Sequence, residues 1–262
     1  MLGNGVKRII FSIYTDRVDD HTSATEYKKK QFIQYKDAII ESHKAYAKTC
    51  NADYELFTTS TTDYNNIQFE KIFKLEELSQ QYDEVLYFDF DIVPNTAVSF
   101  FDYFDLDKIC LYNLPTHIDS KVFRYRIQDN NWHSMDMYSK SCCKNAMLSL
   151  DGFNESSYCM NTGVIGANKK SINNLKFSDR LNECISIFEE CKTDNLYPSE
   201  ISSTWIQNNE VFISYIIERF QVPYTNIGLQ WNFILDHIAK EKSAAAHLYH
   251  CVNKDFSLLL SQ

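Results

Sequence analysis

Short apolar runs and amphipathic stretches alternate along the first third of the chain. The runs at 8–14, 53–57 and 85–89 have the length and composition of buried strands. Between them, residues 26–50 and 65–80 carry apolar side chains at spacings of three and four, which predicts two helices. This alternation of strand and helix predicts an α/β fold with a central, mostly parallel sheet flanked by helices.

The pattern is less regular beyond residue 102. It predicts three further strands and two further helices, at 108–114, 158–167 and 244–250 and at 171–192 and 208–220. The stretch 115–144 has no clean period, which is typical of a binding loop or a lid. No repeat or linker-like segment interrupts the chain, so we expect one domain over residues 1–262.

The apolar run that begins at Val85 ends in two carboxylates, Asp89 and Asp91, one residue apart. Residues i and i+2 of a strand point to the same side, so both carboxylates are expected to face one cavity, and Pro94 is expected to end the pairing of this strand. Ligands of parallel α/β sheets bind at the carboxyl ends of the strands. Paired carboxylates there are hard oxygen ligands for Mg²⁺ or Mn²⁺, and such an ion can hold a diphosphate.

A second Asp-x-Asp, formed by Asp105 and Asp107, follows no apolar strand. We expect it to be a solvated turn, because carboxylates after a buried strand need a partner or a metal, whereas exposed ones do not.

Composition narrows the classes of partner. The 262 residues are 44% hydrophobic and 23% charged, which are values of globular proteins, and the net charge is −9. This charge argues against nucleic acid or an anionic membrane as the main partner. The eight cysteines show no Cys-x-x-Cys spacing, which argues against a zinc ribbon. Without a visible secretory leader or a membrane-spanning apolar run, we expect a soluble, cytoplasmic protein with reduced thiols.

Four short motifs follow one another along the chain. They are Phe69-Glu-Lys71, Tyr87-Phe-Asp89-Phe-Asp91, Met160-Asn161-Thr-Gly163-Val164 and Ala246-His247-Leu-Tyr-His250-Cys-Val-Asn-Lys254. Their order and spacing resemble those of nucleotide-sugar glycosyltransferases of the GT-A fold, in particular the glycogenin and lipopolysaccharide-galactosyltransferase group with its short viral and bacterial relatives. The resemblance implies a nucleotide-sugar-binding half at about 1–100 and an acceptor-binding half at about 101–262.

The resemblance also implies a metal site for Mn²⁺ or Mg²⁺. Asp91 is expected to be a direct ligand, Asp89 a ligand or a contact to the ribose, and His247 the imidazole that completes the site. A mixed carboxylate and imidazole set suits Mn²⁺. His250 stands where the family has glycine, and it is the alternative to His247.

Further residues are expected to bind the donor. The family places a cation at Lys71, and its last motif ends in a phosphate-binding lysine that corresponds to Lys254, here one residue late. Tyr14, Thr15 and Asp16 lie at the carboxyl end of the first predicted strand, where a base or ribose binds in such folds. Core packing is an equal alternative for Tyr14.

The remaining expected catalytic residues, besides Asp89, are Asn161 and Glu210. Asn161 corresponds to a residue that lines the sugar site of the family. Glu210 is the one carboxylate left of an acidic family motif, and it orients the acceptor or acts as a base. The family transfers sugars with retention; an inverting route needs a carboxylate base, for which Glu210 and Asp236 are the candidates.

The predicted activity is thus transfer of a sugar from a nucleoside diphosphate, with UDP favoured, to a glycan or another hydroxyl acceptor. One alternative is a haloacid-dehalogenase-like phosphatase, in which Asp89 attacks phosphorus and Asp91 moves the proton. Its motif usually lies near the start of a chain and is followed by a later acidic pair, neither of which is seen here. The other alternative is a non-catalytic module that binds a nucleotide or a carbohydrate.

Overall fold

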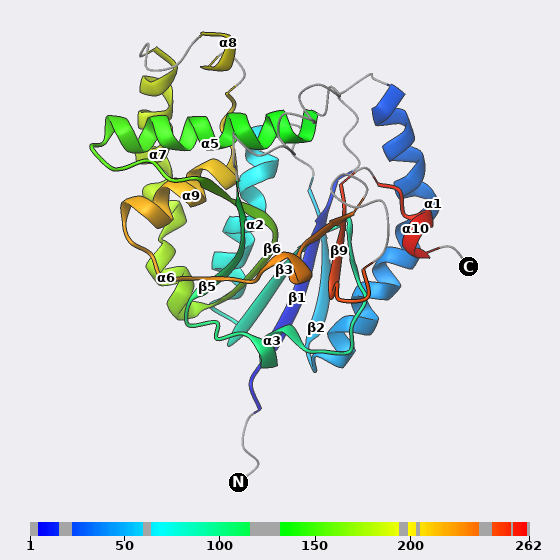
Figure 1. The fold of residues 1–262 in the computed structure, drawn as a ribbon. Coiled ribbons are helices and arrows are strands. Elements are labelled where there is room, and N and C mark those ends of the chain that lie inside the picture. The colour runs from blue at the N-terminus through cyan, green and yellow to red at the C-terminus, as the bar shows by residue number, and fades with distance from the viewer. Residues whose placement is uncertain are drawn as a thin grey trace. The chain divides into compact units, whose positions relative to one another are not determined.

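The structure is a computed structural model, and it describes residues 5–15, 23–59, 64–115, 132–193, 199–202, 205–235, 243–252 and 254–260. These residues form an α/β fold whose central, mainly parallel sheet is flanked by helices, which confirms the predicted fold class (Figure 1). No helix in these ranges has the length and apolar composition needed to cross a membrane.

The chain forms two compact units. The first contains residues 1–112, 163–171 and 225–262, and the second contains residues 113–162 and 172–224. Each unit combines segments that are distant in the sequence. The predicted division of function between the two halves of the chain stays a prediction.

The first five elements follow the predicted order. They are β1 (Arg8–Tyr14), α1 (Ser23–Thr49), β2 (Asp53–Thr58), α2 (Tyr64–Leu78) and β3 (Glu84–Asp89). β1 pairs in parallel with β2 and with β3, and Ile13 lies opposite Asp89 in the second pairing. α1 packs against β2, and α2 packs against β3 (Figure 1). The carboxyl end of β3 thus lies beside that of β1.

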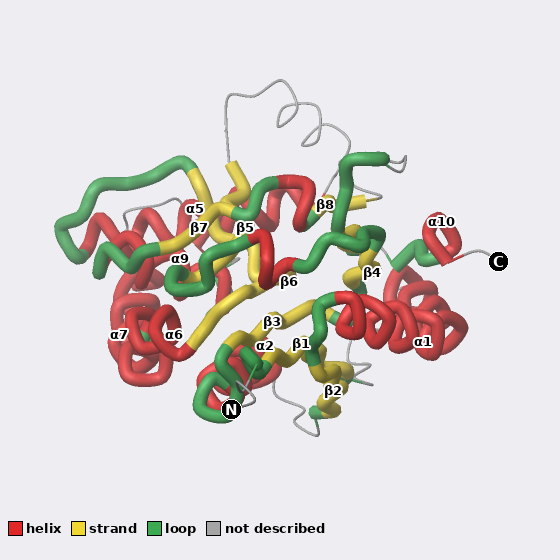
Figure 2. Tube along the Cα trace, turned by 90° about the horizontal axis from the view of Figure 1, so that it is seen from below, coloured by secondary structure: helices red, strands yellow, loops and turns green. Residues whose placement is uncertain are grey.

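The rest of the described chain extends this sheet and forms a second, smaller one. It contains β4 (Ile92–Pro94), α3 (Phe100–Tyr103), β5 (Ile109–Pro115), α5 (Trp132–Leu150), β6 (Tyr158–Asn168), α6 (Lys169–Leu175), α7 (Phe177–Thr193), α8 (Ser199–Ser202), α9 (Asn209–Arg219), β7 (Tyr224–Asn226), η1 (Leu229–Trp231), β8 (Phe233–Leu235), β9 (Leu248–Cys251) and α10 (Ser257–Leu260). The six-stranded sheet has the order β2-β1-β3-β6-β5-β7 (Figure 2). The three-stranded sheet has the order β4-β9-β8. β6 runs antiparallel to β3.

Three predicted elements differ from those observed. The stretch 115–144 is not irregular throughout, because α5 begins at Trp132; residues 116–131 lie outside the described ranges. The single helix predicted at 171–192 is two helices, because Lys176 has a left-handed backbone (φ 47°) that ends α6. The last strand begins at Leu248 rather than at residue 244, because the preceding alanines form a turn closed by the Ala246 amide on the Ser243 carbonyl.

A buried histidine joins α1 to the sheets. Nε2 of His43 lies 2.6 Å from the carbonyl oxygen of Ile92, and Nδ1 lies 3.2 Å from the hydroxyl of Ser12 and 3.1 Å from that of Tyr54. A carbonyl oxygen only accepts hydrogen bonds, so Nε2 carries the proton, and the single lone pair of Nδ1 accepts from one of the two hydroxyl groups. The neutral ring thus fixes the chain directly after Asp91.

This histidine is expected to make the fold sensitive to acid. Burial lowers the pKa of His43 to about 4 from an ordinary 6.5, although its hydrogen bond to Ile92 acts in the other direction. Between these two pH values the unfolded chain binds a proton that the folded chain does not, so the free energy of unfolding falls as the pH falls. The loss is on the order of 3 kcal/mol at the acid end of the interval. Urea unfolding of the wild type and of His43→Gln across this interval measures it. The variant should lose less stability than the wild type, and equal losses would contradict the assignment.

Candidate metal centre

Asp89 and Asp91, which are predicted to share one strand, lie on either side of the end of β3. Asp89 is the last residue of β3, whereas Asp91 lies in the turn that leads into β4. The prediction that both belong to one strand is therefore wrong. The apolar run 85–94 is divided between two sheets, and Pro94 ends β4 rather than the strand of Asp89.

The turn nevertheless brings both carboxylates to one point, together with an imidazole. Asp89, Asp91 and His250 each offer a ligand atom, and these atoms lie within 4.8 Å of one another. Nε2 of His250 is 3.4 Å from Oδ2 of Asp91 and 3.9 Å from Oδ2 of Asp89. The pairing of β4 with β9 sets this arrangement, because it places Ile92 opposite His250. Two carboxylates and one imidazole form a donor set that suits Mn²⁺.

The imidazole of His250 is oriented by an amide behind it. Its Nδ1 lies 3.0 Å from Oδ1 of Asn232, which is fully buried. An amide oxygen accepts, so Nδ1 donates, and in the neutral ring the lone pair of Nε2 faces the carboxylates. Metal-binding histidines are commonly fixed in this way by a hydrogen bond on their second nitrogen. The residues present therefore fit a divalent ion.

Two lysines also contact the carboxylates. Nζ of Lys71 is 2.9 Å from Oδ1 of Asp89, and the same oxygen accepts a 2.6 Å hydrogen bond from the hydroxyl of Tyr87. The ammonium group of Lys254 contacts Oδ2 of Asp91. Oδ2 of Asp89 thus faces His250, while Oδ1 is held by Lys71 and Tyr87.

The charges of this cluster keep Asp91 ionised. Burial raises the pKa of Asp91, which is 5% exposed, but the charges of Lys254 and His250 outweigh burial and hold the pKa well below its ordinary value. Burial lowers the pKa of His250, but the carboxylates of Asp91 and Asp89 outweigh it and raise the pKa above its ordinary value. The cluster therefore has the negative oxygens that a cation requires.

His247, the imidazole expected from the resemblance, lies elsewhere. Its Nδ1 is 3.0 Å from the hydroxyl of Thr96, and its ring stacks on Trp231 at 4.4 Å between centroids. His247 directly precedes β9, whereas His250 lies within that strand, and the contacts of His247 hold its ring against Trp231. The structure brings His250 to the carboxylates, and the metal-binding role of an imidazole stays a prediction. Trp231 is itself buried.

The residues at the end of β1 lie in different surroundings. The ring of Tyr14 is buried against Phe90 and Phe32, with centroids 4.8 and 6.0 Å away, and Nζ of Lys36 lies 4.0 Å from its centroid. These contacts favour the core-packing alternative. Thr15 directly follows β1 and is partly buried, whereas the predicted contact of Asp16 lies outside the described residues.

Asn161 and Glu210 meet in the second unit. Oε1 of Glu210 accepts hydrogen bonds from Nδ2 of Asn161 at 3.0 Å and from the amide of Thr162 at 3.1 Å, and Oε2 lies 2.7 Å from Nζ of Lys140. A carboxylate with both oxygens engaged is stabilised as an anion and is a weak base. This geometry favours a positioning role for Glu210, on Asn161. The other candidate base, Asp236, lies outside the described residues.

Two features lie away from the metal centre. Asp105 and Asp107 form an exposed turn, as predicted, and the carboxylate of Asp107 pairs with Lys170 at 2.6 Å.

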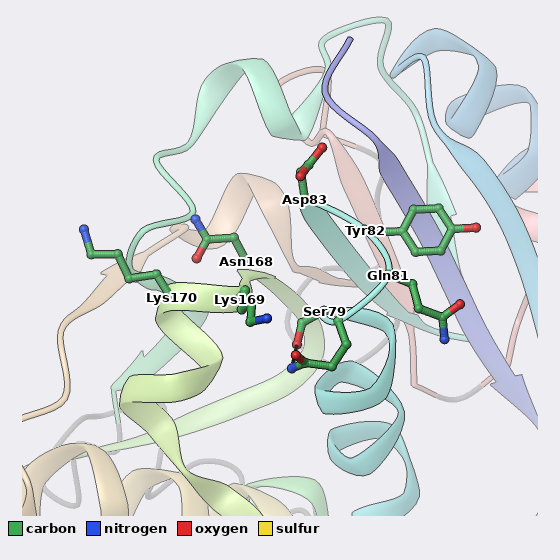
Figure 3. Close-up of a pocket in the computed structure, with 8 residues that line it drawn as sticks. Ser79, Gln81, Tyr82, Asp83, Asn168, Lys169 and Lys170 are labelled. Atoms are coloured by element: carbon green, nitrogen blue, oxygen red, sulfur yellow. Dashed lines mark hydrogen bonds between the residues drawn. The ribbon is translucent and has the colours of Figure 1, made fainter. Parts of the chain in front are cut away.

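A pocket of about 350 Å³ is lined by residues 79–83 and 168–170, and Figure 3 shows that Asp83 lies there directly before β3. Asp89 ends the same strand, roughly 20 Å from Asp83. This pocket therefore lies at the opposite end of β3 from the carboxylate pair.

Sequence reasoning assigns no role to two residues of the centre, Tyr87 and Asn232. Lys254 is expected to bind a phosphate of the donor, and nothing in the sequence indicates its contact with Asp91. The alternation of side chains along β3, which directs Tyr87 and Asp89 to one side, is the signal that could have identified Tyr87.

Comparisons with known proteins give structural likeness without sequence likeness. The sequence matches no family model and no curated protein. The fold is similar to a glycosyltransferase involved in glycosylation of the major capsid of PBCV-1, at 14% identity, 95% coverage of both chains and a TM-score of 0.45. It is also similar to the galactosyltransferase LgtC, solved with donor and acceptor sugar analogues, at 12% identity, 93% and 86% coverage and a TM-score of 0.47. Mouse xyloside xylosyltransferase 1 is similar at 10% identity, 94% and 97% coverage and a TM-score of 0.44. Likeness at this level does not transfer function.

Proposed function

We propose that this protein is a metal-dependent glycosyltransferase of the GT-A type. It moves a sugar from a nucleoside diphosphate donor, of which UDP is the favoured one, to a hydroxyl group of a glycan. The observation that carries the proposal is the convergence of Asp89, Asp91 and His250 at the carboxyl end of β3. The two lysines that contact these carboxylates, Lys71 and Lys254, supply the cations that a diphosphate requires.

The chemistry of the donor explains this combination of groups. Departure of a sugar from a nucleoside diphosphate leaves growing negative charge on the phosphate oxygens. A bound divalent ion supplies stabilisation of that charge without a proton donor. Lys71 and Lys254 neutralise the carboxylates before the donor arrives, and their ammonium groups can turn to phosphate oxygens when it binds. Asn232 keeps His250 directed at the carboxylates throughout.

We propose that transfer proceeds with retention of the anomeric configuration. An inverting enzyme needs a carboxylate base beside the acceptor hydroxyl. Glu210 is a poor candidate, because Lys140 and Asn161 hold its two oxygens. In the retaining route the donor phosphate itself accepts the proton of the acceptor, and no carboxylate base is needed.

A hydrolysis assay tests the proposal against its rivals. With Mn²⁺ and a panel of UDP-sugars we expect slow release of UDP, which chelation of the metal abolishes. Binding of a UDP-sugar without any release would instead indicate a non-catalytic module. Metal-dependent turnover of p-nitrophenyl phosphate that Asp89→Asn abolishes would indicate a phosphatase.

Replacement of Lys254 is expected to change the affinities for the metal and for the donor in opposite directions. Its ammonium group contacts Oδ2 of Asp91, so a metal ion must displace it. Lys254→Met should therefore tighten Mn²⁺ binding in the absence of nucleotide by roughly threefold to tenfold, while UDP binds the metal-loaded variant more weakly. Titration calorimetry measures both. Lys254→Arg keeps the charge and serves as the control, and weaker Mn²⁺ binding by Lys254→Met would contradict the displacement.

A further inference from the structure

The second unit carries a pocket of about 370 Å³ that plays no part in the chemistry above. It is lined by residues just before and at the start of β6, by the end of α9, and by residues 221–224, which connect α9 to the first residue of β7. Its volume falls in the range of small-ligand sites.

The lining offers two kinds of surface. Ser156, Glu218 and Tyr224 contribute oxygen atoms, whereas Met160 and Ile217 contribute apolar surface. A pyranose ring has the matching chemistry, because its hydroxyl groups lie around the rim and its axial C–H groups form an apolar face.

An exposed aromatic ring is available to that face. Tyr158 lines the pocket at the start of β6 and is 37% exposed. Aromatic rings carry partial negative charge on their faces, which attracts the weakly positive hydrogens of C–H groups. Tyr158 can therefore act as a platform on which a sugar ring lies.

The polar side of the pocket is held in place from beneath. The fully buried Lys144 donates to Oε1 of Glu218 at 2.9 Å, and the hydroxyl of Ser156 donates to the same oxygen at 2.5 Å. Within the described part of the chain, no hydrogen bond uses Oε2 of Glu218, which is left to accept from a ligand. The hydroxyl of Tyr224 accepts from Nδ2 of Asn113 at 2.9 Å, so its own proton can be donated.

The charge of the pocket favours a neutral ligand. Lys144 balances the carboxylate of Glu218, and its ammonium group is buried beneath that carboxylate rather than exposed to the pocket. A phosphate or an acidic sugar would meet the carboxylate first. The geometry points to a binding site for a neutral sugar unit, which we propose is part of a glycan acceptor; only this assignment to the acceptor rests on the proposed function.

Saturation-transfer NMR with methyl glycosides of glucose, galactose, mannose, xylose and N-acetylglucosamine tests the site. We use no nucleotide, and the protein carries Asp91→Asn so that the metal centre does not contribute. At least one glycoside should receive saturation, most strongly at the protons of its apolar face. Tyr158→Ala should weaken binding by roughly tenfold, while Tyr158→Phe retains it, because the ring and not the hydroxyl forms the platform.

The control is Tyr27→Ala, which removes a similarly exposed tyrosine on α1. This substitution should leave the affinity for the methyl glycosides unchanged. Failure of every glycoside to bind the Asp91→Asn protein, or equal binding by Tyr158→Ala, would overturn the inference. Neither result would affect the proposed transfer, which is measured separately as metal-dependent release of UDP by the wild type.

Discussion

Asp91→Asn is expected to abolish manganese-dependent binding of UDP and to reduce sugar transfer by roughly a hundredfold or more. An amide cannot supply the negative oxygen that the metal requires. It also leaves the ammonium group of Lys254 and the imidazole of His250, which both contact Asp91 in the wild type, without their shared anion. Isothermal titration of UDP with and without Mn²⁺ measures the loss of binding, and release of UDP from a UDP-sugar measures the loss of activity.

The chain offers a matched control for this substitution. Asp107 belongs to the second Asp-x-Asp and lies in an exposed turn, so Asp107→Asn should leave metal and nucleotide binding unchanged. Thermal unfolding of both variants shows whether the fold persists. Retained manganese-dependent binding of UDP by a folded Asp91→Asn protein would contradict the proposed role of the carboxylate.

His250→Gln is expected to weaken Mn²⁺ binding by roughly tenfold to a hundredfold, because it removes an imidazole nitrogen directed at both carboxylates. The same substitution at His247 should leave Mn²⁺ affinity within about twofold of the wild type, because that ring stacks on Trp231. Electron paramagnetic resonance of free Mn²⁺ during a titration measures both affinities.

This pair of variants distinguishes the two imidazoles without an assumption about the reaction. If His247→Gln weakens Mn²⁺ binding and His250→Gln does not, His247 is the metal ligand. The resemblance of the motifs would then have predicted the ligand correctly, and the pairing of β4 with β9 would not. Loss in both variants would place both imidazoles at the ion. The structure predicts loss at His250 alone.

Local patterns in the sequence predicted the elements that place the site. The apolar runs of β1, β2 and β3 and the spacing in α1 and α2 are properties of short segments, so they are visible without tertiary structure. The same patterns put the carboxylate pair at the carboxyl end of a central strand, where the structure has Asp89.

Features that depend on distant segments could not be predicted in this way. The choice of His250 depends on the register between β4 and β9, which pairs Ile92 with His250. α5 packs against α7 and α9, and these contacts stabilise a helix whose first residues lie in the polar and aromatic stretch that has no clean period. The tyrosine-lined pocket of the second unit likewise joins β6 to the end of α9, and no single segment contains its pattern.

The central claim is that the carboxylates at the end of β3 hold a divalent ion that binds the diphosphate of the donor. Anomalous diffraction from crystals grown with Mn²⁺ and UDP tests it most directly. We expect a manganese peak in contact with Asp89, Asp91 and His250, with the diphosphate bound to the ion and Lys254 turned away from Asp91. A manganese peak elsewhere, or UDP bound while these three side chains contact no ion, would contradict the claim.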